Sequence, residues 1–168
     1  MTIGASSYPS DRPAEAPGRV RQTVLPAGTR ELSTLACIDY EDAFLVDVGL
    51  AQDRTAEQWA RETLEAAPVS TRRALTRGWS GLGLRLGPAQ SDQHVLGWEI
   101  RHSDPDVLLL GACGRLGLSG ELIFQRSPRS LLYATVVQLE NRIARGFWAA
   151  IESRHRRVVQ DLLSNGSK

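Results

Sequence analysis

The chain has 168 residues, of which 42% are apolar, 23% charged and only 6% aromatic. This length predicts a single domain that is large enough to bury a core without a disulfide or a metal. The 20 basic residues are balanced by 19 acidic ones, which gives a formal net charge of +1. Proteins that bind nucleic acid or anionic membranes usually carry a basic excess, so the composition argues against both classes of partner.

The N-terminal region differs in composition from the rest of the chain. Its first 19 residues contain three prolines, two glycines and almost no bulky apolar side chain, so we expect residues 1–19 to form a disordered tail. We expect residues 20–34 to form an extended lead-in, a segment that precedes the folded domain, and residues 35–165 to form that domain. Residues 1–17 lack the basic and apolar regions of a signal peptide, and no apolar run reaches the roughly 18 residues of a membrane span. We therefore expect a cytoplasmic protein.

The cysteines predict neither a disulfide framework nor a metal centre. Cys37 and Cys113 stand far apart, each among apolar residues, which predicts buried free thiols. A disulfide between them is the alternative, which nothing in the sequence favours. No set of His, Cys, Asp or Glu residues has metal-ligand spacing, so we expect neither a metal nor a cofactor.

The first predicted elements are a strand and two helices. Residues 42–49 are β-branched and apolar and end at a glycine, which predicts a strand. Thr55 and Gln58 form a Thr-x-x-Gln capping box, and the apolar spacing that follows predicts a helix ending at Pro68. A second helix is expected over residues 70–79, before a glycine-rich loop.

The second half of the chain predicts an antiparallel sheet followed by a long helix. Four runs with strand character are joined by three to six residues, too few for parallel crossovers. These runs are residues 94–102, 107–113, 118–126 and 130–139. Residues 140–163 predict an amphipathic helix. Its apolar face is expected at Ile143, Phe147, Ile151, Val158 and Leu162. The predicted fold class is α+β: a curved antiparallel sheet packed against a long C-terminal helix, with two short helices after the first strand.

Two segments carry a family resemblance. Residues 39–44 (DYEDAF) and residues 141–156 (NRIARGFWAAIESRHR), together with the element order, resemble the START-like and polyketide-cyclase-like (SRPBCC) superfamily, in an uncharacterised bacterial branch. The resemblance implies a helix-grip fold over residues 35–164, in which the C-terminal helix encloses a ligand cavity against the sheet. Members of this superfamily bind lipids, hormones and polyketides, and only some are enzymes, so the resemblance transfers no catalytic motif.

Three polar side chains are weak catalytic candidates. In the strand expected over residues 94–102, side chains alternate, so that one apolar face has a histidine at each end. His94 and His102 there either meet a ligand near neutral pH or lie in solvent at the strand ends. If the face of the strand that carries Tyr133 points inward, its hydroxyl is available to a ligand in the cavity. Otherwise its ring packs against neighbouring residues and its hydroxyl is exposed to solvent.

The expected inner faces provide apolar walls for a small-molecule site, with a fully packed core as the alternative. The expected lining residues are Trp79, Leu96, Trp98, Ile100, Leu122, Phe124, Phe147 and Ile151. Glu121 is expected on the solvent face of its strand, as are Glu99 and Arg101, which are expected to form cross-strand ion pairs.

With the resemblance, these patterns predict a protein that binds a small, largely apolar molecule between its sheet and its C-terminal helix. It would act as a binding protein or as a cofactor-free, cyclase-like enzyme of bacterial secondary metabolism. The alternative from another class is a non-catalytic interaction protein. It would form a homodimer or dock through Trp148 and the Arg-rich side of the last helix.

Overall fold

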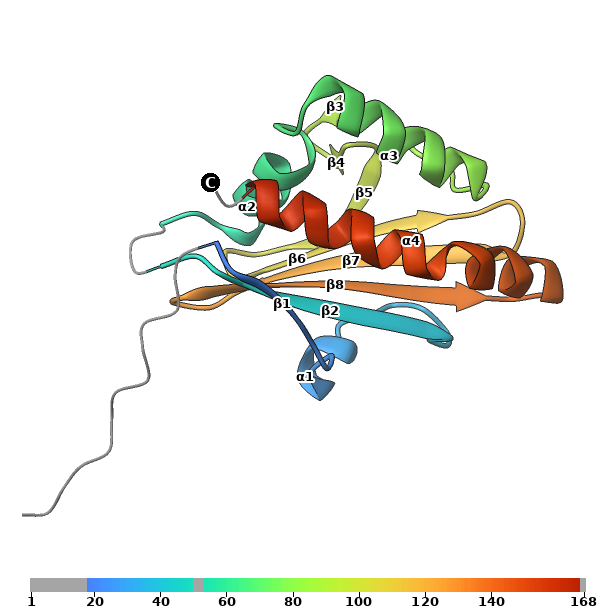
Figure 1. Ribbon diagram of the computed structural model, residues 1–168, viewed down its shortest axis with the longest axis horizontal. Helices are drawn as coiled ribbons and strands as arrows, with labels where there is room; N and C mark the ends of the chain where they lie inside the picture. Colours follow the sequence, from blue (N-terminus) through green and yellow to red (C-terminus); the bar gives the residue numbers. More distant parts are fainter. Residues whose placement is uncertain (1–17, 50–52, 167–168) are drawn as a thin grey trace, which may run out of the picture.

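The computed structural model describes residues 18–49 and 53–166, which form one antiparallel sheet of eight strands with helices on both faces (Figure 1). The sheet order is β1-β2-β8-β7-β6-β5-β4-β3, so β1 and β3 are its edges. The strands are β1 (Val20–Thr23), β2 (Tyr40–Asp47), β3 (Gln90–Ser91), β4 (His94–Val95), β5 (Trp98–Ser103), β6 (Val107–Cys113), β7 (Leu118–Arg126) and β8 (Ser130–Leu139). The helices are α1 (Ala27–Arg30), α2 (Ala56–Leu64), α3 (Val69–Gly81) and α4 (Arg142–Gly166).

The structure confirms the α+β class, the antiparallel sheet and the long C-terminal helix. The strand expected first is the second, because β1 pairs with it at the sheet edge. Helices α2 and α3 therefore lie between the second and third strands. Residues 20–34, expected as an extended lead-in, contribute β1 and α1, while residues 1–17 of the expected tail lie outside the described residues.

The predicted capping box starts α2. The Thr55 hydroxyl accepts the Gln58 N–H at 3.2 Å, and the Gln58 side chain accepts the Thr55 N–H at 2.8 Å. Both contacts satisfy backbone donors that a helix N-terminus leaves free. Trp59, Ala60 and Leu64 then point from α2 into the core.

The strand expected over residues 94–102 is wrong, because the chain reverses direction in its middle. Leu96 (φ +46°) and Gly97 (φ +90°) form a two-residue turn between β4 and β5. Such turns require positive φ at both central residues, which glycine adopts freely and leucine does not. The turn splits the expected alternation, so side chains before and after it do not share one continuous face.

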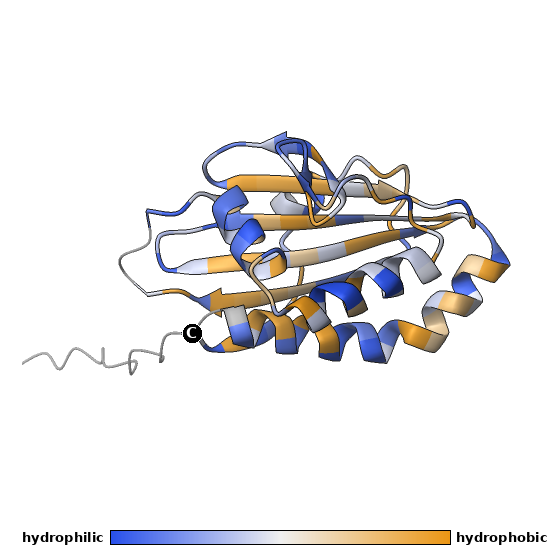
Figure 2. Ribbon diagram, turned by 90° about the horizontal axis from the view of Figure 1, so that it is seen from above, coloured by the Kyte–Doolittle hydropathy of each residue, from blue (hydrophilic) through white to orange (hydrophobic). Residues whose placement is uncertain are grey.

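The sheet is buried on both faces. Its inner face packs against α2, α3 and α4 in the larger core, which contains Tyr133. Its outer face, which includes Leu132 and Ala134, is covered by Leu25 and by residues Leu32, Leu35 and Ile38 after α1. Tyr133 therefore belongs to the inner face. Figure 2 shows hydrophobic residues along the strands and a mixture of hydrophobic and hydrophilic residues along α4.

The outer face holds a buried acid, contrary to the expected exposure of Glu121. Its carboxylate is fully buried and accepts the Ser33 hydroxyl at 2.6 Å, the Thr34 N–H and hydroxyl, and Arg101 Nη1 at 2.7 Å. Arg101 thus pairs across two strands with Glu121, rather than with Glu99. The segment after α1 provides both the cover and the hydrogen-bond donors that sequence alternation does not reveal.

The cysteines are also placed differently from the prediction. Both are exposed free thiols, with Cys37 donating to Asp39 Oδ2 and Cys113 accepting from Arg101. In β6 the neighbouring Ala112 is buried, and alternation along the strand puts Cys113 on the opposite face.

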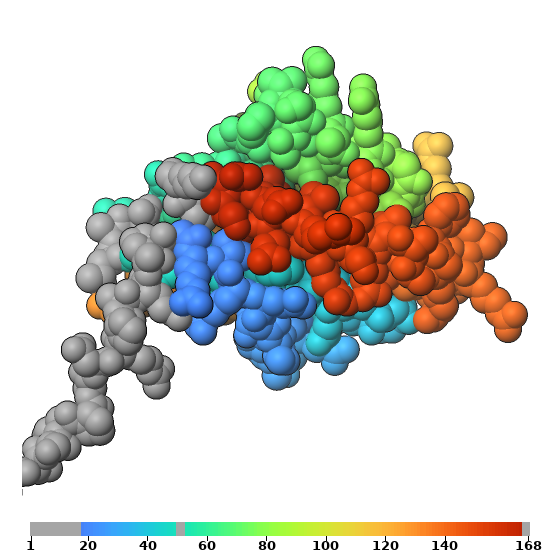
Figure 3. Space-filling view, viewed as in Figure 1, coloured from blue at the N-terminus to red at the C-terminus, as the bar shows by residue number. Residues whose placement is uncertain are grey.

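Helix α4 lies along the molecule beside α3 (Figure 3). Its buried stripe matches the predicted one only at Ile151 and Leu162. Phe147 is 52% exposed, whereas its neighbour Trp148 is 5% exposed. The other buried residues are Ala144, Val159, Leu162 and Leu163, while Ile143 and Val158 are exposed. Apolar residues occupy two adjacent stripes about 100° apart, and periodicity does not choose between them. The Asn141 side chain accepts the Ala144 N–H at 2.8 Å and donates to the Leu116 carbonyl at 3.1 Å, which orients the start of the helix.

Candidate functional site

Neither candidate histidine lies on the inner face. His94 pairs with Glu99, while the adjacent pair of Val95 and Trp98 points into the core. The His94 ring packs over Gly87, where a Cβ atom would lie 2.3 Å from Nε2, and its Nδ1 is 3.2 Å from Ser91 Oγ. The turn at residues 96–97 accounts for this placement.

A β-bulge displaces the second histidine. The register of β5 against β6 shifts between Ile100 and His102, so His102 stands opposite Leu109 of the outer face. Its side chain is 54% exposed, and its Nε2 lies 2.9 Å from Asp104 Oδ2. The two histidines and Tyr133 are therefore not brought together.

Most of the predicted lining residues do face the inner core. Leu96, Trp98, Leu122 and Phe124 are buried there, and Trp79, Ile100 and Ile151 pack against them with partial exposure. Trp79 and Trp98 meet edge to face at 5.4 Å between ring centroids. Phe147 does not belong to this set, because it points away from the sheet.

A polar cluster lies in the inner core beneath α4. We define the Asp42 cluster as Tyr40, Asp42, Tyr133, Thr135 and His155. Asp42 and Thr135 stand opposite each other in the register of β2 and β8, and Tyr133 lies two residues before Thr135 on the same face. His155 reaches the cluster from α4. Sheet register and helix position thus bring together residues more than 100 positions apart in sequence.

Asp42 is at the centre of this cluster. Its side chain is 1% exposed, and Oδ2 accepts the Tyr40 hydroxyl at 2.7 Å. The same oxygen lies 3.2 Å from Nε2 of His155, whose side chain is 16% exposed. Arg156 Nε donates to the Tyr40 hydroxyl at 3.1 Å and places a cation at the edge of the cluster.

The two tyrosines of the cluster are held in the neutral form. Burial raises the pKa of Tyr133 well above its ordinary value, and Thr135 donates to its hydroxyl at 3.3 Å. Burial is also the main cause that raises the pKa of Tyr40, against the opposing effect of Arg156. Near neutral pH both phenols are therefore protonated and provide hydrogen-bonding groups in an apolar surrounding.

Several buried polar atoms of this region have no hydrogen-bond partner among the described residues. They include Asp42 Oδ1 and Trp148 Nε1, which lie in or beside the cluster. Buried polar groups are almost always hydrogen-bonded, so an unpaired carboxylate oxygen at 1% exposure requires an explanation. The arrangement presents one acceptor, one imidazole and one indole donor to the same part of the core.

Sequence reasoning did not select Asp42 or His155. Both occur within the two segments that carry the family resemblance, and Asp42 stands between Tyr40 and Phe44 on one face of β2. A single acid in an otherwise apolar alternation is the signal that marks it. His155 has no comparable signal, because its place depends on which stripe of α4 faces the sheet.

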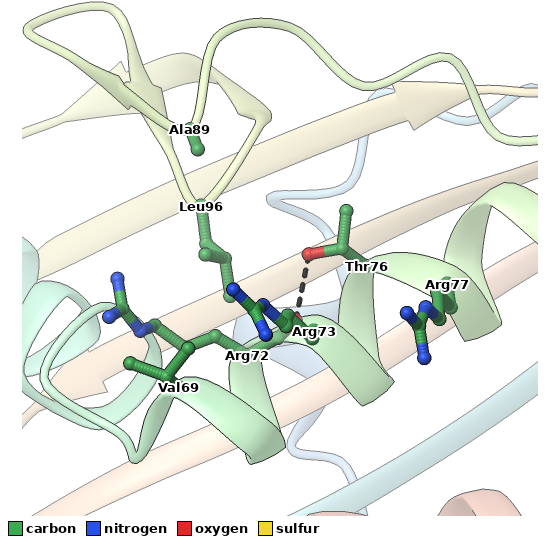
Figure 4. A pocket seen from close by; sticks show the side chains of 7 residues that line it. All are labelled: Val69, Arg72, Arg73, Thr76, Arg77, Ala89 and Leu96. Carbon is green, nitrogen blue, oxygen red and sulfur yellow. Dashed lines mark hydrogen bonds between the residues drawn. The ribbon is translucent and has the colours of Figure 1, made fainter.

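A second feature is a surface pocket of about 330 Å³ between α3 and the β3–β4 region (Figure 4). Its lining residues are Val69, Arg72, Arg73, Thr76, Arg77, Ala89 and Leu96. Leu96 is the one predicted lining residue that this pocket shares. Three guanidinium groups give it a character quite different from that of the Asp42 cluster.

Comparison with known proteins adds no assignment: no protein-family model matches the chain, and no relative is found among curated proteins. Within residues 18–49 and 53–166, no helix combines the length and apolar character needed to cross a membrane. In the same part of the chain, no three His, Cys, Asp or Glu side chains are grouped as metal ligands would be.

Proposed function

We propose that the chain is a START-like, helix-grip protein that holds a small, largely apolar molecule between its sheet and α4. The observation that carries this proposal is the unpaired Oδ1 of Asp42 in the core. A buried carboxylate is costly unless its lone pairs are satisfied. A hydroxyl group of a bound molecule, donated to Oδ1, would remove that cost.

The neighbouring groups define the rest of the bound molecule. Trp148 Nε1 is an unpaired donor and calls for an acceptor such as a ketone or ester oxygen. The surrounding core residues, which include Trp98, Leu122 and Phe124, have aromatic and aliphatic side chains. A compact molecule with an apolar body, one hydroxyl and one carbonyl oxygen fits these requirements.

A cyclase-like reaction would add a proton transfer to this binding function. His155 is the imidazole of the Asp42 cluster, with its Nε2 3.2 Å from Asp42 Oδ2, and imidazole is the side chain most often used as a general base. Removal of a proton beside the carbonyl of the bound molecule would give an enolate, with the proton on His155. Tyr40 and Tyr133 would act by positioning, since both stay neutral.

Native mass spectrometry of the undenatured protein tests this function. We expect a non-protein mass on the wild-type chain and its loss in Asp42→Asn, which keeps the shape and removes the charge. Asp47→Asn is the matched control on the same strand, because the Asp47 carboxylate lies outside the Asp42 cluster and accepts the Gly49 N–H at 3.1 Å. A bare wild-type chain, or an equal mass on both variants, would contradict the proposal.

A homodimer through α4 is the second candidate function, favoured by a specific observation. Ile143, Phe147 and Val158 are exposed along one side of the helix, at 65%, 52% and 37%. Trp148, expected at this interface, is buried and unsuited to it. A dimer mass in the same native spectra, lost in Phe147→Ser, would support this candidate, whereas a monomer at all concentrations would contradict it.

A further inference from the structure

The pocket beside α3 has one wall from a helix and one from a hairpin. Val69, Arg72 and Thr76 follow at spacings of three and four, which puts their side chains on one face of α3. Arg73 and Arg77, four residues apart, lie together on one side of that face, and Leu96 stands opposite it (Figure 4). A volume of about 330 Å³ is in the range of small-molecule sites.

The charge of this pocket is unbalanced. No carboxylate of the described residues forms an ion pair with Arg72, Arg73 or Arg77, and Arg72 Nε is a buried donor without a partner. By contrast, Arg61 of α2 pairs with both Glu57 and Glu65. Three neighbouring cations on one helix repel each other unless an anion lies between them.

The opposite wall is held rigidly by α2. The Leu96 N–H donates to Glu65 Oε1 at 3.0 Å, and Arg61 donates to the carbonyls of His94 and Ser91 at 3.2 and 3.3 Å. These contacts keep Leu96 at its unfavourable positive φ, with 4% exposure. Backbone strain of this kind persists only where the surroundings impose it. The result is a fixed apolar surface facing the guanidinium groups.

We propose that this pocket binds an amphipathic organic anion. The carboxylate or phosphate head accepts hydrogen bonds from the guanidinium groups that line the pocket, and the apolar chain lies against Leu96 and Val69. Guanidinium donors bind such heads in a planar, bidentate manner, which is why arginine suits them better than lysine. The pocket shares Leu96 with the apolar core, but none of its lining residues belongs to the Asp42 cluster, so binding here does not require Asp42.

Isothermal titration calorimetry of the full chain with octanoate, octyl phosphate and 1-octanol tests the proposal. The three probes share one apolar chain and differ in the head group. Arg72→Gln and Arg77→Gln remove the proposed contacts, and Arg154→Gln removes an exposed charge of α4 as the matched control. We expect octanoate or octyl phosphate to bind, with affinity about tenfold lower in each pocket variant and unchanged in the control. The relative affinity of the two anions shows whether the natural head is a carboxylate or a phosphate.

Three results would overturn the proposal: no binding of either anion, equal binding of 1-octanol, or equal affinities in Arg72→Gln and Arg154→Gln. Thermal denaturation is the check that the variants are folded. Arg72→Gln removes no side-chain hydrogen bond to a described residue. Asp42→Asn is expected to bind octanoate like the wild type. If the interior site is refuted, binding of octanoate to the surface pocket is still expected. If the surface pocket is refuted, the interior site is still expected to hold its molecule.

Discussion

Replacement of Glu121 by alanine is expected to lower the free energy of unfolding by about 3–5 kcal/mol, the range for removing one partner of a buried ion pair. The Glu121 side chain is 0% exposed and that of Arg101 is 21% exposed. Alanine leaves the Ser33 hydroxyl, the Thr34 N–H and one guanidinium N–H without their acceptor. Each such loss costs about 1–3 kcal/mol, and partial access of water to Arg101 keeps the total below their sum.

Urea denaturation followed by circular dichroism measures this change. Glu31→Ala, at an exposed glutamate beside α1, is the matched control and should change stability by less than about 0.5 kcal/mol. Hydrogen exchange should also become faster across residues 25–38, because Glu121 holds that segment on the sheet. A loss below about 1 kcal/mol, or unchanged exchange in residues 25–38, would refute the anchoring role of Glu121.

Three further predictions concern the helix, the hairpin and the buried phenols. Trp148→Ala should destabilise the fold by about 3–5 kcal/mol and Phe147→Ala by less than about 0.5 kcal/mol in urea denaturation; the reverse order would show that α4 is rotated. Gly97→Ala should lower the free energy of unfolding by about 1–3 kcal/mol in the same assay. The reason is that Gly97 has a φ of +90° and that an added Cβ atom would lie 3.0 Å from Leu86 Cβ. An unchanged stability would show that the turn is wrongly described. Burial raises the pKa of Tyr40 and Tyr133 in the folded state above the value in the unfolded state. The folded state is therefore fully stable below about pH 10, the pKa of an unfolded tyrosine, and loses stability as the pH rises beyond it. Tyrosinate absorbance should therefore show two of the three tyrosines ionising only with alkaline unfolding, and ionisation of all three in the folded protein would contradict their burial.

Local chemistry was sufficient to predict most of the elements. The capping box at Thr55 and the short connections between strands are properties of a few adjacent residues, and tertiary structure does not change them. The α+β layout follows from these elements because an apolar sheet face requires a cover. The single strand over residues 94–102 failed because its turn contains Leu96 where asparagine or glycine is usual. The contact of Leu96 with Glu65, a residue of another element, holds that turn.

Other errors arose where a distant segment decides between two local options. On α4, the stripe of Phe147 and the stripe of Trp148 are both apolar, and the contacts of Asn141 select the second. Glu121 was expected in water because residues 25–38 show no periodicity that predicts a cover for the outer face. The burial of Glu121 therefore depends on a segment about 90 residues earlier in the chain.

The candidate site was predictable only in its walls. Apolar alternation identifies Trp98, Leu122 and Phe124. The buried face of a strand can be recognised from the strand's own residues, because alternate side chains point to the same face. The meeting of Asp42 with His155 requires both the register of β2 and the rotation of α4. Neither quantity can be obtained from a single segment, so the polar centre of the site became visible only in three dimensions.

Asp42 Oδ1 is a buried acceptor without a partner among the described residues, and we propose that a bound molecule donates to it. A crystal structure of the chain purified without denaturation, at a resolution that shows ordered water, measures this directly. We predict density for a small organic molecule between α4 and the sheet, with a polar atom about 2.7–3.2 Å from Oδ1. A water molecule or a protein donor at that position, with the core otherwise filled by side chains, would contradict the claim.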